Sequence, residues 1–218
     1  MAIPKVIYQT FRDRRLPLHT RWYIARMKQR NSGYAYEFYD DARIEDFILK
    51  EYGPGLCTLF RRIQIGAAKA DLFRYLILYR FGGIYLDIDS RMTGRADHFL
   101  RPLDEAVLAK ENLPEQYFVQ WALVYSAGHP FLKRTIEKVT YNLENNLFPH
   151  NSHSMTGPKP YTEAIRECLQ ENPAIPWREM EIDYKGFLKF KYPLSKLMYR
   201  KGEHWKEMQK TVTVMRPE

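Results

Sequence analysis

Residues 81–90 read FGGIYLDIDS: two glycines, a mainly apolar run and two aspartates one residue apart. The apolar run over 84–88 predicts a buried strand, because strands covered on both faces are apolar throughout. Side chains repeat every two residues along a strand, so we expect Asp87 and Asp89 to face the same side, about 6 to 7 Å apart. One hard cation with its waters and a diphosphate fits between two such carboxylates. The alternative is a polar strand end at which Asp89 only begins a turn.

Strand and helix patterns alternate along the chain and predict one α/β domain. Strands are expected at 5–9, 36–39, 84–88, 106–109 and 117–125, and helices at 18–30, 41–52, 56–64, 67–80, 130–147 and 161–169. Gly82 and Gly83 should end the helix before the aspartates. Residues 149–160 have the composition of a loop, and the last fifty residues show no clear pattern.

The composition limits the class of protein. The chain has 218 residues, which suits one domain, and a net charge of +8, which favours anionic partners. The 34 basic residues are spread along the chain rather than gathered into an arm, which argues against a dedicated nucleic-acid module. Cys57 and Cys168 form neither a disulfide framework nor a CxxC zinc motif. With no cleavage signal and no apolar run of membrane-spanning length, we expect a cytoplasmic protein, with room for a peripheral contact with anionic membrane.

The helix before the paired aspartates carries a second charged pair. Its sequence is AAKADLFRYLILYRF (67–81), in which Asp71 and Arg74 are three residues apart and share a face. Taken alone, such a pair is ordinarily a surface ion pair worth a few tenths of a kcal/mol. Its position one helix upstream of Asp87 and Asp89 makes the combination more specific than either pair.

The combined motif resembles a known family. The matching residues are Ala67, Asp71, Leu72, Arg74, Tyr75, Leu78, Tyr79, Gly82, Gly83, Tyr85, Leu86, Asp87 and Asp89. They resemble the DXD-containing, sugar-binding-region glycosyltransferases of the Och1-like mannosyltransferase group, and the core also resembles the glycosyltransferase domain of large clostridial toxins. Four further segments are similar to family segments: IPKVIYQTF (3–11), AGHPFL (127–132), TGP (156–158) and KGEHWKE (201–207).

The resemblance implies a GT-A fold, that is, a single Rossmann-like nucleotide-sugar-binding domain over 1–218 with a mixed central sheet. Residues 1–100 would mainly bind donor and metal, and 101–218 would supply the acceptor side and a C-terminal metal and phosphate segment. The implied activity is metal-dependent transfer of a hexose, with retention, from a UDP-sugar or GDP-mannose to a glycan, lipid or protein-linked glycan. The implied cation is Mn²⁺ or Mg²⁺, and nucleic acid is not an expected partner.

The resemblance also implies roles for the four charged residues. Asp89 would ligate the metal directly, and Asp87 would contact the metal or the ribose. Asp71 would accept hydrogen bonds from sugar hydroxyls, for which a carboxylate is suited because it accepts two. Arg74 would contact the sugar or the diphosphate. Positive groups and a cation at this place stabilise the charge that grows on a diphosphate leaving group.

The wider donor-binding set rests on the same resemblance. Gln9 and Thr10 would lie near the base, and Tyr85 and Gly157 would line the donor site. At the C-terminal end, Trp205 would cover the phosphates.

Three histidines are candidate metal ligands. The resemblance also implies that His204, or its neighbour Glu203, would complete the metal shell, a role for which neutral imidazole is suited. The alternative is that His204 and Trp205 only pack on the surface. His150 and His153 form an HxxH pair in a Pro/Gly/Ser-rich stretch without a third partner, which favours a solvated loop.

The same residues also bear on other functions. An EF-hand fails, because the fifth, sixth and twelfth positions from Asp87 are Arg91, Met92 and His98. A haloacid-dehalogenase-like phosphatase using Asp87 as nucleophile and a non-enzymatic, basic nucleic-acid-binding protein remain alternatives. Residues 120–121, a Gln-Trp pair, are expected in the core rather than at an acceptor site.

Overall fold

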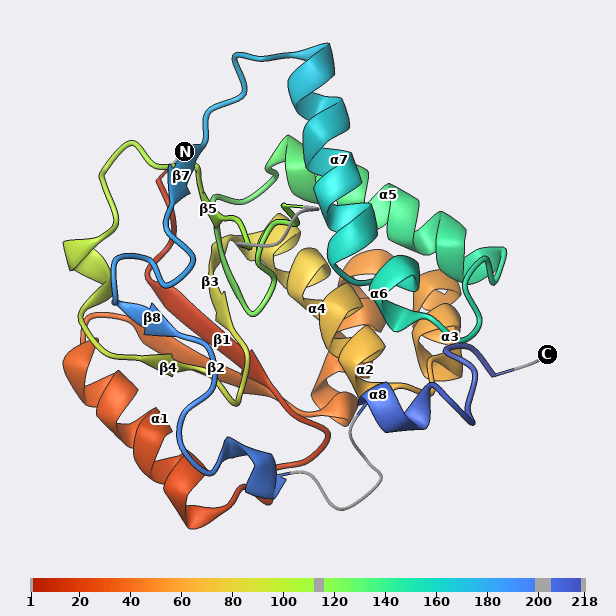
Figure 1. The fold of residues 1–218 in the computed structure, drawn as a ribbon, viewed down its shortest axis with the longest axis horizontal. Coiled ribbons are helices and arrows are strands. Elements are labelled where there is room, and N and C mark those ends of the chain that lie inside the picture. The colour runs from red at the N-terminus through yellow and green to blue at the C-terminus, as the bar shows by residue number, and fades with distance from the viewer. Residues whose placement is uncertain (1, 112–115, 199–204, 217–218) are drawn as a thin grey trace.

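The computed structural model describes residues 2–111, 116–198 and 205–216, and within them a mixed sheet of six strands forms the centre (Figure 1). The order is β2-β1-β3-β6-β5-β7, with bounds Ala35–Tyr39, Val6–Thr10, Gly83–Leu86, Ala122–Tyr125, Ala106–Ala109 and Arg178–Met180. β1 is parallel to β2 and β3, β5 is parallel to β7, and β6 is antiparallel to β3 and β5. The predicted α/β class with a mixed sheet is confirmed.

The two faces of the sheet are covered differently. One side carries a group of helices, α2 (Asp41–Tyr52), α3 (Pro54–Arg62), α4 (Gly66–Phe81), α5 (Pro130–Glu144), α6 (Ser152–Met155) and α7 (Pro158–Glu171). The other side carries α1 (Leu18–Arg30) and a two-stranded ribbon of β4 (Arg91–Met92) and β8 (Leu188–Lys189).

Alternate strand residues enter two separate hydrophobic cores. Tyr8 and Tyr85 pack with the helical group, whereas Ile7 and Ile84 pack on the side of α1 and the ribbon. This alternation follows from the period of two along a strand, and burial on both sides explains why β3, with the sequence GIYL, is apolar throughout.

The glycine pair connects α4 to β3. Gly82 caps α4 with φ +66°, and its N–H donates to the Leu78 carbonyl at 2.8 Å. Gly83 has φ +115°, and a Cβ there would lie 2.6 Å from Cγ1 of Val6 on the neighbouring strand β1. The pair therefore ends the helix, as predicted, and also lets β3 lie close against β1.

Most predicted elements are confirmed, and the differences are local. The strand predicted over 84–88 ends at Leu86, so the DxD aspartates do not belong to it. The strand predicted over 117–125 begins only at Ala122. The stretch 149–160 contains the short helix α6 and the start of α7 rather than a continuous loop. The C-terminal region, for which the sequence shows no pattern, forms β7, β8, a 3₁₀ turn η2 (Ser195–Met198) and α8 (Trp205–Met208).

A second 3₁₀ turn, η1 (Ala96–His98), follows β4. Within the described ranges, no helix has both the length and the apolar content required to cross a membrane.

Candidate active site

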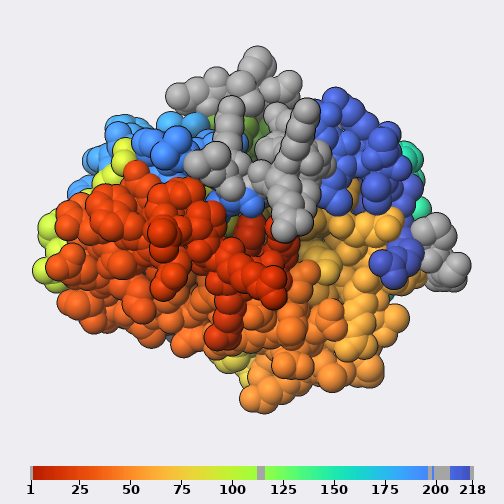
Figure 2. Space-filling model, turned by 90° about the horizontal axis from the view of Figure 1, so that it is seen from below, coloured from red at the N-terminus to blue at the C-terminus, as the bar shows by residue number. Residues whose placement is uncertain are grey.

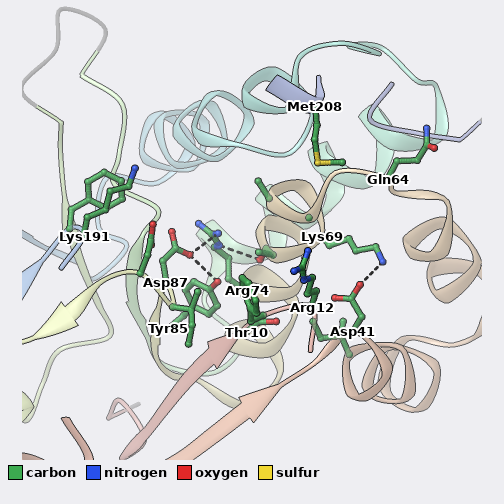
Figure 3. A pocket seen from close by; sticks show the side chains of 18 residues that line it. Thr10, Arg12, Asp41, Gln64, Lys69, Arg74, Tyr85, Asp87, Lys191 and Met208 are labelled. Carbon is green, nitrogen blue, oxygen red and sulfur yellow. Dashed lines mark hydrogen bonds and ion pairs between the residues drawn. The ribbon is translucent and has the colours of Figure 1, made fainter. Parts of the chain in front are cut away.

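A cavity of about 470 Å³ lies at the carboxyl ends of β1 and β3. These strands are parallel neighbours, so the residues that follow them meet at one edge of the sheet, where open α/β sheets bind ligands. Figure 3 shows the lining side chains, which come from the end of β1, the starts of α2 and α4, the turn after β3, and the C-terminal region. All four predicted catalytic residues lie at or beside it, and of these Arg74, Asp87 and Asp89 line it.

Arg74 is the centre of the charged cluster. Its Nη2 lies 3.0 Å from Oδ1 of Asp87 and 3.3 Å from Oδ1 of Asp71. Its Nη1 donates to the Gln120 carbonyl at 2.8 Å, and its Nε donates to the Ala70 carbonyl at 3.2 Å. The guanidinium is thus fixed by four acceptors on α4, on the turn after β3 and on the segment before β6. The Asp71–Arg74 pair is buried, not the surface ion pair expected of such a spacing by default.

Asp71 is held from outside its own helix as well. The Thr156 hydroxyl donates to Oδ2 of Asp71 at 2.8 Å, so the TGP segment contributes to the cluster through its threonine. Burial raises the pKa of Asp71 to about 6, although Arg74 and Thr156 act in the opposite direction. Each oxygen of this buried carboxyl has one fixed partner and can still accept a second hydrogen bond from a ligand that reaches it.

Asp87 lies in a tight turn rather than on a strand. Its N–H still donates to the Trp121 carbonyl at 2.8 Å, but its carbonyl accepts the Ser90 N–H at 2.9 Å and closes the turn 87–90. The Tyr85 hydroxyl donates to Oδ1 of Asp87 at 3.0 Å, and the Gln9 amide donates to the Asp87 carbonyl at 3.2 Å. The argument that strand alternation aligns the two aspartates was therefore wrong, because the turn, and not the pleat, directs both into the cavity.

Asp89 is 6% exposed, and no other side chain donates a hydrogen bond to its carboxylate among the described residues. Burial raises the pKa of Asp89 to about 6, the neighbouring Asp87 adds to the effect, and Lys191 opposes it. Two carboxylates that lack a shared donor favour a cation between them. The described part of the chain offers no cluster of three or more His, Cys, Asp or Glu ligands. The carboxylates of Asp87 and Asp89 fit Mg²⁺ or Mn²⁺, because such an ion is held by one or two carboxylates together with waters and phosphate oxygens.

The donor-binding predictions separate into three groups. Thr10 and Tyr85 line the cavity. Gln9 is not among the lining residues and instead supports the backbone of Asp87. Gly157 also lies outside the lining, at the start of α7, where a Cβ would come within 2.8 Å of the backbone of His153.

The C-terminal predictions concern residues at the start of α8 and just before it. His204 and Glu203 lie outside the described residues. Trp205 begins α8, and Met208 of the same helix lines the cavity, so this segment returns to the site.

The HxxH pair has other contacts. Nδ1 of His150 lies 3.2 Å from the Gln209 carbonyl, and the His153 ring packs edge-on against Tyr117. Neither histidine lines the cavity. As expected, Gln120 and Trp121 are buried in the interior.

Several lining residues were missed by the sequence reasoning. At the end of the cavity away from Lys191, Lys69 forms an ion pair with Asp41 at 2.7 Å, beside Arg12 (Figure 3). Asp41 was recognised only as a helix start, and Lys69 lies in the matched motif without belonging to its pattern. At the other end, Phe190 and Lys191 come from the region without periodicity, in which no local signal marks them.

Comparisons with known proteins agree with this geometry. The model of the family described as "Glycosyltransferase sugar-binding region containing DXD motif" matches residues 17–112, which include all four charged residues. An uncharacterized glycosyltransferase of Acanthamoeba polyphaga mimivirus is 37% identical over 173 residues, covering 78% of this chain and 68% of the relative. The chain belongs to the DXD glycosyltransferase family.

Other members of the DXD glycosyltransferase family are longer. A mannosyl phosphorylinositol ceramide synthase of Saccharomyces cerevisiae is 35% identical over 160 residues, 72% of this chain but 40% of that protein. The chain spans 40% to 49% of the length of the first fungal relatives it matches. Among solved structures, a protein described as PaToxG glycosyltransferase superposes with a TM-score of 0.60 at 18% identity, covering 79% of this chain and 71% of that one. This likeness supports the fold.

Proposed function

We propose that this chain is a metal-dependent hexosyltransferase that takes its sugar from a nucleotide-diphosphate donor. The observation that carries the proposal is that Arg74, Asp87 and Asp89 line one cavity at the carboxyl ends of parallel strands, with Asp71 paired to Arg74 beside it. The mannosyltransferase names of the longer relatives support a hexose donor, UDP-sugar or GDP-mannose, and a glycan or inositol phosphoceramide-like lipid acceptor.

The proposed roles follow from the contacts. Asp89 and Asp87 would hold the divalent cation, which when bound neutralises charge on the leaving diphosphate. Asp71 would accept sugar hydroxyls, because its Oδ2 and Oδ1 are oriented by Thr156 and Arg74. The nucleoside would extend from Asp87 past Thr10 toward the Lys69–Asp41 pair, since the cavity continues in that direction (Figure 3).

Arg74 has a positioning role in this proposal. Its guanidinium is already engaged by two carboxylates and two carbonyls, so it orients Asp71 and Asp87 for the donor. Contacts within the protein hold the cluster in place, which favours electrostatic stabilisation of the departing diphosphate with little reorganisation. We propose transfer with retention of the anomeric configuration, as in the family it belongs to.

The phosphatase alternative is less well supported. Its nucleophile would be Asp87, but Oδ1 of Asp87 accepts hydrogen bonds from Arg74 and Tyr85, which lowers its nucleophilicity. The family match also favours sugar transfer.

The test is a donor screen by thermal denaturation, with UDP- and GDP-sugars in the presence of Mn²⁺, of Mg²⁺, or of neither. At a ligand concentration a hundredfold above Kd, binding adds about 2.7 kcal/mol to the stability of the native state. For a chain of this size that is a rise in Tm of roughly 5 to 10 °C. Donor hydrolysis and sugar transfer are then measured with the donor that binds.

Asp89→Asn is the decisive variant. It should fold, because protonation already neutralises this carboxyl near pH 6, but it should lose cation-dependent donor binding and turnover. The matched control is Asp46→Asn on the exposed surface of α2, which should leave both unchanged. Normal turnover by Asp89→Asn would refute the metal role of Asp89, and hydrolysis of simple phosphomonoesters instead of donor would favour the phosphatase.

A further inference from the structure

The net charge of the chain is concentrated in one segment. Residues 12–30 contain seven Lys or Arg and one Asp, a net charge of +6, whereas the whole chain carries +8. The basic residues are spread along the sequence, but elsewhere acidic residues nearly balance them. The positive field of this protein therefore originates mainly from α1 and the segment before it.

The outward side of α1 combines this charge with exposed apolar side chains. Leu18 is 79% exposed and Trp22 is 55% exposed, and their i, i+4 spacing puts them on the same side of the helix. Arg21 lies between them in sequence, and the guanidinium of Arg26 stands 5.7 Å from the Trp22 ring. We call Leu18, Arg21, Trp22 and Arg26 the α1 face.

The positive charges around the α1 face are largely unbalanced within the protein. Arg15, Arg21, Arg26, Lys28 and Arg30 form no ion pair with any described residue, although Arg14 pairs with Asp40 at 3.0 Å. Charges that are not neutralised internally remain available to an anionic partner.

Helix α1 packs against a C-terminal segment that lines the candidate active site. The Tyr23 ring stacks on Tyr192 at 4.3 Å, and the Tyr192 hydroxyl donates to Thr20 at 2.7 Å. The segment held in this way carries two more exposed apolar residues, Phe190 at 52% and Leu194 at 66%, and Phe190 lines the cavity. In Figure 2 the red and orange N-terminal surface lies directly beside the blue C-terminal surface on one side of the molecule.

We propose that the α1 face, together with Leu194, docks on an anionic lipid bilayer. Trp and Leu enter the interfacial region of a bilayer while adjacent Arg side chains reach the phosphate level, which is the composition of interfacial helices. A second copy of the chain is a poor partner, because the same surface would meet its own positive charge. A nucleic acid would match the arginines, but it gives no reason for exposed Leu18 and Leu194.

Docking in this way would bring the cavity close to the bilayer, since Phe190, which lines the cavity, lies four residues before Leu194 on the segment that packs against α1. This orientation rests on the proposed function and suits a lipid-linked acceptor. Binding to vesicles does not rest on it, so failure to bind vesicles would leave the glycosyltransferase proposal intact, and failure of sugar transfer would leave the docking proposal intact.

The experiment is vesicle flotation of the chain. Vesicles of phosphatidylcholine alone are compared with vesicles containing about 30% phosphatidylserine, at about 0.1 M and about 0.5 M salt. Each basic residue near an anionic surface is worth about fivefold in partition, so Arg21→Gln/Arg26→Gln should weaken binding roughly 25-fold. Leu18→Ser/Trp22→Ser should weaken it by about tenfold or more.

Matched controls alter the same residue types elsewhere. Leu103→Ser/Tyr141→Ser removes exposed apolar side chains, and Lys50→Gln/Lys133→Gln removes two positive charges. Both should bind anionic vesicles as the parent chain does, and all variants should keep the same Tm because the altered side chains are exposed.

Binding to anionic vesicles that both α1 variants lose, and both controls keep, supports the proposal. No binding to anionic vesicles, or equal binding to neutral ones, would overturn it. Loss in the arginine variant but not in Leu18→Ser/Trp22→Ser would also overturn it, because adsorption would then be purely electrostatic. Tight binding of a single-stranded oligonucleotide, unaffected by Leu18→Ser/Trp22→Ser and without vesicle binding, would point to a nucleic acid instead.

Discussion

Replacing Arg74 with Met should cost much of the stability of this fold. The Arg74 side chain is 6% exposed and is the shared partner of Asp71 and Asp87, whose side chains are 10% and 25% exposed. Removing one partner of a buried ion pair leaves an uncompensated charge and typically costs about 3 to 5 kcal/mol. Because a domain is stable by only about 5 to 15 kcal/mol, this loss is a large fraction of the whole.

The same helix provides a matched control. Arg80, also on α4, pairs with Glu51 at 2.6 Å, but its side chain is 54% exposed. Arg80→Met should cost about 1 kcal/mol or less, as exposed pairs do. Met and Arg have similar helix propensities, so the difference between the two variants reports the buried polar contacts of Arg74 rather than helix propensity.

Urea unfolding followed by circular dichroism measures both variants at pH 7.5. The midpoint should fall much further for Arg74→Met than for Arg80→Met, with the same m-value in each. A double-mutant cycle with Asp71→Asn should give a coupling of about 0.5 to 3 kcal/mol, because the second change removes a carboxylate that the first has left unpaired.

The stability lost in Arg74→Met should depend on pH, which a purely steric effect would not. Without Arg74, the pKa of Asp71 should rise above its present value of about 6. A carboxyl with a raised pKa in the folded state binds more protons there than when unfolded, so stability falls as the pH rises through that pKa. The gap between Arg74→Met and the parent chain should therefore widen between pH 6 and pH 8. Equal losses in Arg74→Met and Arg80→Met, or a gap that narrows with pH, would refute the reasoning.

Three further predictions concern single contacts. His129 caps α5 through Nδ1, which accepts the Phe131 N–H, and burial lowers its pKa to about 4. The folded state therefore binds fewer protons than the unfolded one between about pH 6.5 and 4, so the parent chain loses stability on acidification. In His129→Asn, which keeps a capping side chain, this loss between pH 7 and pH 5 should be smaller by about 2 kcal/mol in urea unfolding. Gly83→Ala should cost about 2 kcal/mol or more in the same assay, because φ is +115° and the new Cβ would meet β1 at 2.6 Å. Thr156→Val should cost about 2 kcal/mol by removing the hydroxyl that donates to Asp71, and should raise the pKa of Asp71 further.

Each of these has a control or a contrary result. If the parent chain and His129→Asn lose stability in parallel on acidification, His129 is not the titrating group. Gly33→Ala, where nothing lies within 4 Å of the new Cβ, should be nearly neutral, and an equal loss there would remove the steric argument for Gly83. Thr156→Ser keeps the hydroxyl and should retain most of the stability, so an equal loss in both Thr156 variants would assign the effect to packing.

The sequence predicted the elements that carry local signals. The helix over 67–80 was placed within one residue at each end, because its run of helix-forming residues stops at a glycine pair that closes it. The strand after it was placed two residues too long. Ile88 and Asp89 continue the apolar and polar alternation, but the Ser90 N–H to Asp87 carbonyl bond turns the chain there. A turn of this kind is decided by one backbone contact and not by a side-chain pattern.

The sequence predicted which residues form the charged cluster but not the distant contacts that hold them in place. Asp71 and Arg74 share a helix face by spacing alone, and this prediction is confirmed by the 3.3 Å contact. That the pair is buried depends on Thr156, 85 residues away, and on the Gln120 carbonyl, 46 residues away. Long-range contacts of this type leave no periodic trace, and Lys191 escaped prediction for the same reason.

The charge balance of the cavity couples binding of the cation to binding of the nucleotide. Two carboxylates, on Asp87 and Asp89, line it, Asp71 lies beside it, and Arg74 is engaged by Asp71 and Asp87. A nucleoside diphosphate alone would bring further negative charge against Asp89, and a cation alone would find only two protein carboxylates, too few to hold a hard ion without other oxygens. Each ligand therefore supplies what the other lacks, and the coupling between them must be reciprocal. In the donor screen, the shift with cation and nucleotide together should accordingly exceed the two separate shifts combined, whereas a phosphate site built from arginine and lysine alone would bind the nucleotide without the cation.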